Sequence, residues 1–311
     1  MSVFTVVEEA ALRDWLGQYN LQLVSFEGIA AGVTNTNYFV HTTHGRYVLT
    51  LFETLKLAEL PFYLELMSHL ARHGVACPAP LLDQQDRLTS MLAGKPACLV
   101  TCLNGRDVET PSAVQCRAVG DMLASQHRAA ATFKLQMDNP RGPAWWQRTA
   151  DTLYPLMAPA DAELLRDEIA RQAGLRQSPL PRGVIHADLF KDNVLMDGDR
   201  IAGFIDFYYA CNDVLIYDVA IAVNDWARLP DGSIDAGLAR AFLQGYQSVR
   251  PFSAAESSAW PLMLRAAALR FWVSRLLDLH HPMPGSLTYT KDPDVFRQLL
   301  LAHRQRTDFW L

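Results

Sequence analysis

The stretch GVIHADLFKDNVLMDGDRIAGFID, residues 183 to 206, decides how the rest of the chain is interpreted. It holds His186, Asp188 and Asn193 in the order H-x-D-x-x-x-x-N, and the apolar run after them ends at Asp206. Phosphoryl transfer needs one carboxylate to hold the attacking hydroxyl, and an amide and a second carboxylate to hold magnesium. The stretch therefore predicts a phosphoryl-transfer site, with Asp188 as the base and with Asn193 and Asp206 as metal ligands.

The local pattern places these side chains at the ends of short strands. Residues 184–185, 193–196 and 201–205 are apolar runs of strand type, and Asp197 and Gly198 begin a tight turn between the last two. A single His or Asp in a loop is most often a capping or turn residue. Four polar positions at the spacing that marks the catalytic loop and metal-binding aspartate of kinases are much harder to obtain that way, so the functional interpretation is favoured.

The bulk properties of the chain argue against several classes of protein. With 311 residues it forms one large domain or two of ordinary size. Its net charge of −5 argues against a nucleic-acid surface, and it has no apolar run long enough for a membrane span. The start MSVFTVVEEAALRDWL lacks a signal-peptide pattern, and the odd number of five cysteines favours reduced thiols. We therefore expect a cytoplasmic protein without nucleic-acid or membrane partners.

A glycine-rich turn precedes the second predicted strand. The segment GIAAGVTNTNYFV, residues 28–40, contains two glycines followed by a polar cluster. A turn poor in side chains lets backbone N–H groups approach phosphate oxygens. Gly28, Gly32, Thr34 and Asn35 are therefore candidate nucleotide-binding residues, and an ordinary hairpin turn is the alternative.

The next strand lacks a residue that a nucleotide site usually has. In RYVLTLFE, residues 46–53, Thr50 stands where kinase-like chains carry the lysine that grips the nucleotide phosphates. Thr50 is included among the candidate nucleotide-binding residues. Arg46 and Lys56 are the candidates to replace the lysine.

Two lobes are predicted from the position of a very apolar strand, residues 97–102, which ends in Leu103-Asn104-Gly105. A nucleobase inserted beside Thr101 and Leu103 would hydrogen-bond to backbone groups. The expected boundaries are an N-terminal nucleotide-binding lobe over residues 1–102, a hinge over 103–106, and a catalytic and substrate-binding lobe over 107–311.

The second lobe is expected to be mainly helical. Apolar spacing predicts helices over residues 112–128, 161–173, 238–249 and 261–279 and another that ends at Trp226, whereas residues 133–146 are typical of a loop. Asp218 should cap the helix that ends at Trp226 or anchor the catalytic loop. Arg265 lies in an apolar stripe, so it needs an acidic partner. A structural salt bridge is the default interpretation, and a substrate carboxylate is the alternative.

These motifs together resemble a known group of enzymes. The glycine-rich turn, VLTLFE (48–53), IHADLFKDNVL (185–195) and FIDF (204–207) resemble, in this order, the aminoglycoside phosphotransferase and choline kinase superfamily. Within it, VLTLFE with threonine in place of lysine, FIDFYYACNDVLIYDVAIAVNDW (204–226) and LRAAALRFWVSRLLD (264–278) closely resemble the bacterial homoserine kinases of this fold.

The resemblance implies an α+β, protein-kinase-like bilobal fold, with an antiparallel sheet in a small N-terminal lobe and a larger, mainly helical C-terminal lobe. It also implies phosphorylation of the side-chain hydroxyl of L-homoserine in threonine biosynthesis, with ATP and Mg²⁺. Asp188 would take the hydroxyl proton late, Asn193 and Asp206 would hold magnesium, and His186 would brace the loop.

Homoserine is a zwitterion, so its pocket needs a cation and an anion. The candidates are Arg265, Arg270 and Arg275 for the carboxylate and Asp225 for the ammonium group, with Tyr208 nearby.

Three other functions are alternatives. The first is another kinase of this fold that acts on an aminoglycoside, choline or methylthioribose. The second is a nucleotide-binding module without catalysis, suggested by Thr50. The third is a metal-dependent hydrolase with His186 and Asp188 as ligands, for which the sequence offers no further ligands at suitable positions.

Overall fold

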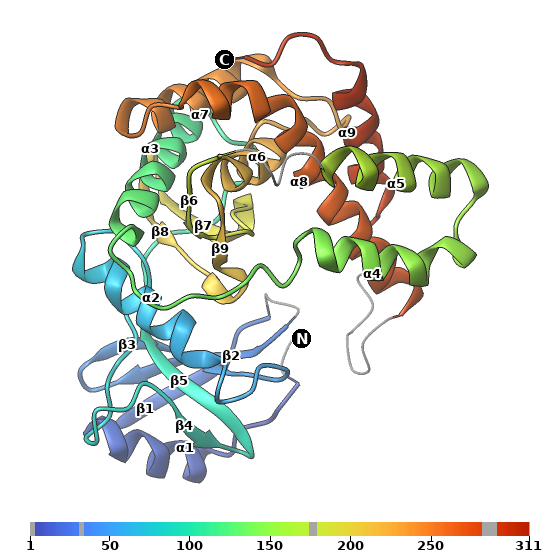
Figure 1. Ribbon diagram of the computed structural model, residues 1–311. Helices are drawn as coiled ribbons and strands as arrows, with labels where there is room; N and C mark the ends of the chain where they lie inside the picture. The colour runs from blue at the N-terminus through green and yellow to red at the C-terminus, as the bar shows by residue number, and fades with distance from the viewer. Residues whose placement is uncertain (1–3, 31–33, 174–178, 282–290, 311) are drawn as a thin grey trace. The chain divides into compact units, whose positions relative to one another are not determined.

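The structure is a computed structural model that describes residues 4–30, 34–173, 179–281 and 291–310 (Figure 1). The described chain divides into two compact units, one up to Asn104 and one from Gly105 onward. The role of residues 103–106 as a hinge stays a prediction. Among the helices of the described ranges, none combines the length and apolar character that a membrane span needs.

The first unit is a five-stranded sheet with two α-helices. Its strands pair antiparallel in the order β1-β2-β3-β5-β4. Along β2, side chains alternate between buried and half-buried, as expected for a strand with one face on a core. Leu12 and Leu16 of α1 share that core with Val40 and Leu49 of the sheet. The elements are α1 (Glu9–Leu16), β1 (Leu23–Gly28), β2 (Thr36–Thr42), β3 (Gly45–Leu51), α2 (Leu60–Arg72), β4 (Ser90–Leu92) and β5 (Lys95–Thr101).

The second unit is mainly helical and contains two small antiparallel sheets, β6 with β9 and β7 with β8. Its helices are α3 (Ala113–Ala130), α4 (Pro143–Leu153), α5 (Pro159–Gln172), α6 (Leu215–Trp226), α7 (Ala236–Val249), α8 (Ala254–His280) and α9 (Asp294–Gln305). Its strands are β6 (Arg182–Ile185), β7 (Val194–Asp197), β8 (Arg200–Phe204) and β9 (Cys211–Val214), and short 3₁₀ turns are η4 (Lys191–Asn193) and η5 (Phe207–Tyr209).

Helix α6 lies at the centre of the second unit. All 12 of its residues are buried, which fits a sequence that is apolar on nearly every side. It contacts α3, α7 and α8 (Figure 1). Helices α3 and α7 pack closely through Gly120 and Gly245, because a Cβ atom at either position would overlap the backbone of the other helix. The core of this unit therefore forms around α6.

The predicted α+β class is confirmed, but several elements of the second unit differ from the sequence prediction. Residues 133–146 were expected as a loop, whereas α4 begins at Pro143, because proline is favourable in a first helical turn. The helix expected from Pro261 begins earlier, where Ser253 and Glu256 form a capping box. Strand β9 and helix α9 were not predicted.

Candidate active site

The loop that follows β6 is held by a buried carboxylate. Asp218 of α6 accepts a hydrogen bond from the backbone N–H of His186 at 2.8 Å and another from that of Ala187 at 2.8 Å. Ala187 has φ of 63°, a left-handed conformation that is costly for a residue other than glycine. Of the two roles expected for Asp218, the structure supports that of anchor, since the residue lies inside α6 and Val214 is the N-cap.

A chain of polar side chains extends from Asp218. His127 Nε2 donates to Asp218 Oδ2 at 3.0 Å, and Tyr246 Oη lies 2.7 Å from His127 Nδ1. Arg250 donates to Tyr246 Oη at 3.1 Å and forms an ion pair with Glu256 at 2.9 Å. Burial alone would raise the pKa of Asp218, but the hydrogen bond and charge of His127 and the contacts of the His186 loop hold it below its usual value. Asp218 is therefore a charged acceptor within the core.

Asp188 lies between an arginine and an amide. Its Oδ1 is 3.2 Å from Arg270 Nη1, and Asn193 Nδ2 donates to the backbone oxygen of Asp188 at 2.8 Å and to Oδ2 at 3.4 Å. The Asp188 side chain is 17% exposed, so it is accessible to a ligand. Burial raises the pKa of Asp188, and the charge of Arg270 opposes this rise. Arg270 thus favours the ionised carboxylate that a base requires.

Asp206 is held beside Asn193, because the backbone N–H of Ile205 donates to the backbone carbonyl of Asn193 at 3.0 Å. It has φ of 61° and is accessible to solvent. The protein atoms crowded around its carboxyl group and the negative charge of Asp188 raise the pKa of Asp206 to about 7. The Asp206 carboxylate and the Asn193 side-chain oxygen, beside the Asp188 carboxylate, form a donor set suited to a hard cation.

The described residues contain no group of three His, Cys, Asp or Glu side chains that could hold a metal ion by themselves. This finding fits Mg²⁺, which is usually bound by one or two carboxylates and completed by water and phosphate oxygens. Asn193 and Asp206 therefore suit that ion better than they suit a closed metal cage.

His186 braces the site from within the core. It is fully buried, and its Nε2 donates to the Ile205 carbonyl at 3.0 Å. Its ring lies 4.7 Å from that of Phe207. Burial lowers the pKa of His186, while the charges of Asp218 and Asp188 oppose this effect. The contacts join the loop after β6 to the segment that carries Asp206, and they leave His186 no access to a ligand.

Most of the residues predicted for the substrate have partners within the protein. Arg265 donates its Nε to the fully buried Glu168 at 3.0 Å, as the default interpretation expected, so its assignment to the substrate carboxylate is corrected. Arg275 donates to the backbone oxygen of Asp292 at 2.8 Å, and burial lowers its pKa to about 10.

Asp225 and Tyr208, two further residues predicted for the substrate, lie on different elements. Asp225 accepts from the backbone N–H of Lys191 at 2.9 Å and from Arg228 at 3.3 Å, so its oxygens support η4. Tyr208 lies in η5, two residues after Asp206, and is half-buried. Of the predicted substrate residues, only Arg270 contacts Asp188 directly.

The residues predicted for the nucleotide belong to the first unit. Gly28 ends β1, and Gly32 lies outside the described residues. Thr34 is half-buried and Asn35 is buried at the start of β2. Thr50 is buried, and its hydroxyl donates to Asn37 at 2.8 Å.

The last strand of the first unit carries the other nucleotide candidates. The Thr101 hydroxyl accepts from the backbone N–H of Ala79 at 2.8 Å, and Leu103 follows β5. The sequence interpretation missed an ion pair here, between Lys95 of β5 and Glu53 at 3.0 Å. An acidic residue just after VLTLF was the only available signal for it.

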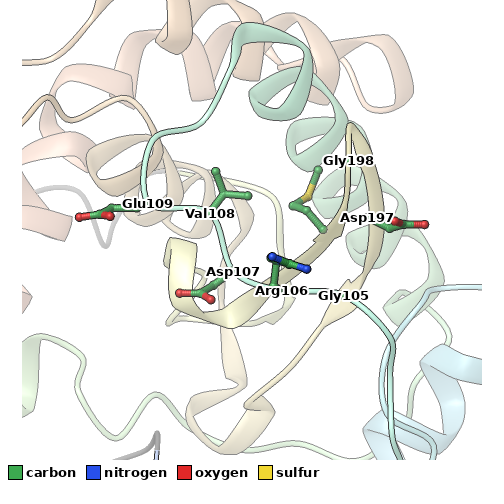
Figure 2. A pocket seen from close by; sticks show the side chains of 8 residues that line it. Gly105, Arg106, Asp107, Val108, Glu109, Asp197 and Gly198 are labelled. Carbon is green, nitrogen blue, oxygen red and sulfur yellow. The ribbon is translucent and has the colours of Figure 1, made fainter.

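A hollow of about 620 Å³ lies at the start of the second unit. Figure 2 shows its lining, which comes from residues 105–109 and the turn after β7. Gly105 is required there, because a Cβ atom would lie 2.9 Å from Ala202 Cβ in a backbone with φ of 139°. The lining contains none of Asp188, Asn193 and Asp206, so this hollow is not the candidate site.

Comparisons with known proteins agree with this geometry. Residues 25–252 match the model of the phosphotransferase enzyme family. The chain belongs to that family. This phosphotransferase is 54% identical to the homoserine kinase of Neisseria meningitidis serogroup B over 303 residues, covering 97% of this chain and 99% of that one. It is 50% identical to the homoserine kinase of Methylobacillus flagellatus, covering 96% of this chain and 94% of that one. The resemblance seen in the sequence is confirmed.

Solved structures of more distant proteins share the fold of this phosphotransferase. An amicoumacin kinase in complex with AMP-PNP and Ca²⁺ matches with a TM-score of 0.72 at 15% identity, over 96% of this chain and 92% of that one. The choline kinase of Cryptosporidium parvum matches with a TM-score of 0.64 at 14% identity, over 90% of this chain and 88% of that one. At these identities the likeness confirms the kinase-like fold alone.

Proposed function

We propose that the protein transfers the γ-phosphoryl group of ATP to the side-chain hydroxyl of L-homoserine. Relatives named homoserine kinases, which align over nearly the full chain, support this substrate. Kinases of other small molecules match only at the level of the fold, so the alternative substrates are not favoured. The observation that carries the chemistry is the meeting of Asp188, Asn193 and Asp206 beside a loop held from the core.

Asp188 acts as the base in this proposal. Its carboxylate accepts a hydrogen bond from the substrate hydroxyl and takes the proton late, as the bond to phosphorus forms. Arg270 favours the ionised carboxylate, against the effect of burial on its pKa, and fixes its orientation. Asn193 fixes the other carboxylate oxygen, which leaves the accessible side of Asp188 to the substrate.

Asn193 and Asp206 hold Mg²⁺ in this proposal. When bound, the ion neutralises charge on the phosphate oxygens during transfer. Asp206 is ionised in that state, because a cation offsets the repulsion from Asp188 that raises the pKa of the free carboxyl. His186 keeps the two loops in register through its bond to the Ile205 carbonyl.

The nucleotide contacts of the first unit are also part of the proposal, with the adenine ring near the chain at residues 101–103 and a hinge at 103–106. The proposed residues are Gly28, Gly32, Thr34, Asn35, Thr50, Thr101 and Leu103. We further propose a cytoplasmic enzyme of threonine biosynthesis with no nucleic-acid or membrane partner. Each of the five cysteines, all of which the structure describes, has a free thiol, which supports a reducing compartment.

The variant Asp188→Asn tests the central role. We expect kcat to fall by at least about 10³-fold, because an amide cannot accept the proton. The Kd for ATP should stay within a factor of about three, measured by equilibrium binding. Asp199→Asn is the matched control, because Asp199 is exposed in the β7–β8 turn. Unchanged turnover in Asp188→Asn would remove Asp188 from the mechanism.

A coupled assay of ADP release tests the substrate. Homoserine, choline, an aminoglycoside and methylthioribose are compared at equal concentration with the unmodified protein. We expect turnover with homoserine to exceed that with each of the others by at least about 100-fold in kcat/KM. No ADP release with homoserine would contradict the proposed function.

A further inference from the structure

A zwitterionic substrate needs one cation and one anion with unused hydrogen-bonding groups, a requirement that rests on the proposed function. Most charged side chains considered above do not meet it. Arg270 is paired with Asp188, and Arg275 donates to the Asp292 backbone. Asp225 already accepts two hydrogen bonds. The substrate's charged groups therefore require other partners.

Arg141 lies on a loop that is fixed to β9, the strand just after η5. The backbone N–H of Asn212 donates to the Met137 carbonyl at 2.7 Å, and the Asn212 side chain accepts from the Met137 N–H at 2.8 Å. Asn139 donates to Asp213 at 2.7 Å and accepts from the backbone N–H of Arg141 at 2.8 Å. Three of these hydrogen bonds thus fix the loop that carries Arg141 to β9, and the fourth lies within the loop.

The guanidinium of Arg141 has its face covered and its edges free. It lies 4.5 Å from the ring centroid of Trp145, in a cation–π contact. Within the part of the chain that the structure describes, it has no acidic partner and its side chain donates no hydrogen bond. A guanidinium stacked in this way presents its coplanar N–H groups for bidentate binding of a carboxylate.

Asp278 supplies the matching negative charge. It follows Arg270 by two steps of four residues on α8, so both side chains project from the same side of the helix. Helix α4, which begins two residues after Arg141, packs against α8. Asp278 is accessible to solvent, and no described residue forms an ion pair with it. Its carboxylate is free to accept hydrogen bonds from a ligand.

The charges of these groups act on one another. Burial raises the pKa of Asp278, and the charges of Arg141 and then Arg270 oppose the rise. Burial also raises the pKa of Tyr209. The charge of Asp188 raises this pKa further, whereas the charges of Arg270 and Arg141 lower it. The Arg270 guanidinium lies 5.3 Å from the Tyr209 ring centroid. Asp278 therefore lies within electrostatic reach of Arg141 and Arg270, and Arg141 lies within reach of Tyr209, which follows Asp206 by three residues. Arg141 and Asp278 form no ion pair with each other within the described residues.

We propose that Arg141 binds the α-carboxylate and Asp278 the α-ammonium group of L-homoserine. The two contacts fix the backbone end of the amino acid, so that its side-chain hydroxyl is directed to Asp188. In this arrangement Arg270 orients the base Asp188, and the substrate carboxylate is bound by Arg141 and not by Arg270.

Two truncated substrates test each contact separately. 3-Aminopropan-1-ol lacks the carboxylate of homoserine, and 4-hydroxybutyrate lacks the ammonium group. We expect the unmodified protein to prefer homoserine over each by on the order of 100-fold or more in kcat/KM. Arg141→Gln should lose that preference over 3-aminopropan-1-ol but keep it over 4-hydroxybutyrate, and Asp278→Asn should do the reverse. In both variants KM for homoserine should rise while KM for ATP stays unchanged.

Controls separate this inference from folding and from the proposed function. Arg148→Gln and Asp151→Asn change exposed charges of α4 and should keep both preferences. Arg141→Lys keeps the charge without the fork, so it should recover part of the KM effect, and circular dichroism checks that each variant is folded. Folded variants that keep both preferences would overturn this assignment alone. A protein that does not phosphorylate homoserine would overturn the proposed function instead.

Discussion

Replacing Asp218 by Asn tests how the catalytic loop is held. The carboxylate accepts two backbone N–H groups, each at 2.8 Å, and also receives the His127 contact. Asparagine has nearly the same shape but keeps only one acceptor oxygen. One charge-assisted hydrogen bond is lost, at about 1.5–3 kcal/mol, and one buried N–H then faces an NH₂ group, at about 1–3 kcal/mol. We expect the free energy of unfolding to fall by about 3–6 kcal/mol.

The same change should affect catalysis beyond its effect on stability. The left-handed backbone of Ala187 costs about 1–2 kcal/mol, so it relaxes when its N–H group loses a partner. Asp188 is the next residue, and a displacement of about 1 Å is enough to lower kcat by about 100-fold.

Urea unfolding followed by circular dichroism measures the stability of Asp218→Asn, and a coupled assay at saturating substrates measures kcat on folded protein. Asp231→Asn is the control, since that carboxylate lies in an exposed turn and its loss should cost less than about 0.5 kcal/mol. The expected loss is about 3–6 kcal/mol, so a free energy of unfolding of Asp218→Asn within about 1 kcal/mol of that of the unmodified protein would refute the anchoring role.

Three further changes probe the structure away from the reacting groups. Glu168 is the buried partner of Arg265, so Glu168→Gln should lower the free energy of unfolding by about 3–5 kcal/mol without changing KM for homoserine. A raised KM for homoserine at unchanged stability would instead assign Arg265 to the substrate site. Burial lowers the pKa of His303 to about 3 from its usual 6.5, so the unfolded chain binds the proton before the folded chain does as pH falls. The free energy of unfolding should therefore fall by about 1.4 kcal/mol per pH unit between these two pKa values. His303→Gln should flatten this slope in urea titrations at several pH values. Gly245→Ala should lower the thermal midpoint strongly, because the added Cβ overlaps a backbone carbonyl of α3. Gly17→Ala is the control and should raise the midpoint slightly, because the space around Gly17 is open. Equal effects of the two changes would contradict the packing of α3 on α7.

The elements that the sequence predicted well are those whose signal is local. The helices expected over residues 112–128 and 238–249 are α3 and α7, and the apolar strand expected over 97–102 is β5, since local apolar patterns define all three. The loop from His186 to Asn193 was also predicted, because each side chain in the motif has a chemical reason for its position. Local period and motif spacing therefore sufficed for the fold class, whereas the catalytic roles of the motif residues stay a prediction.

The parts that were missed depend on distant partners. Strand β9 is only four residues long, and its polar positions Asn212 and Asp213 are used by the loop around Asn139, more than 70 residues earlier. No periodic signal marks such a strand. The first turn of helix α4 was expected as a loop because it begins at the last proline of Asn-Pro-Arg-Gly-Pro, a sequence that equally suits a turn.

Helix α8 explains why the substrate residues could not be assigned from spacing. Arg265, Arg270 and Asp278 all lie on it, and helical geometry predicts only the side of the helix from which each projects. Their roles are decided by partners on other elements. Arg265 meets Glu168, which is 97 residues away in the chain, and Arg270 meets Asp188, which is 82 residues away. A charged residue on an apolar helix face indicates that it has a partner, because a buried charge without one is costly. Only the tertiary contacts reveal whether the protein supplies that partner, as for Arg265, or leaves the position open to a ligand, as we propose for Asp278.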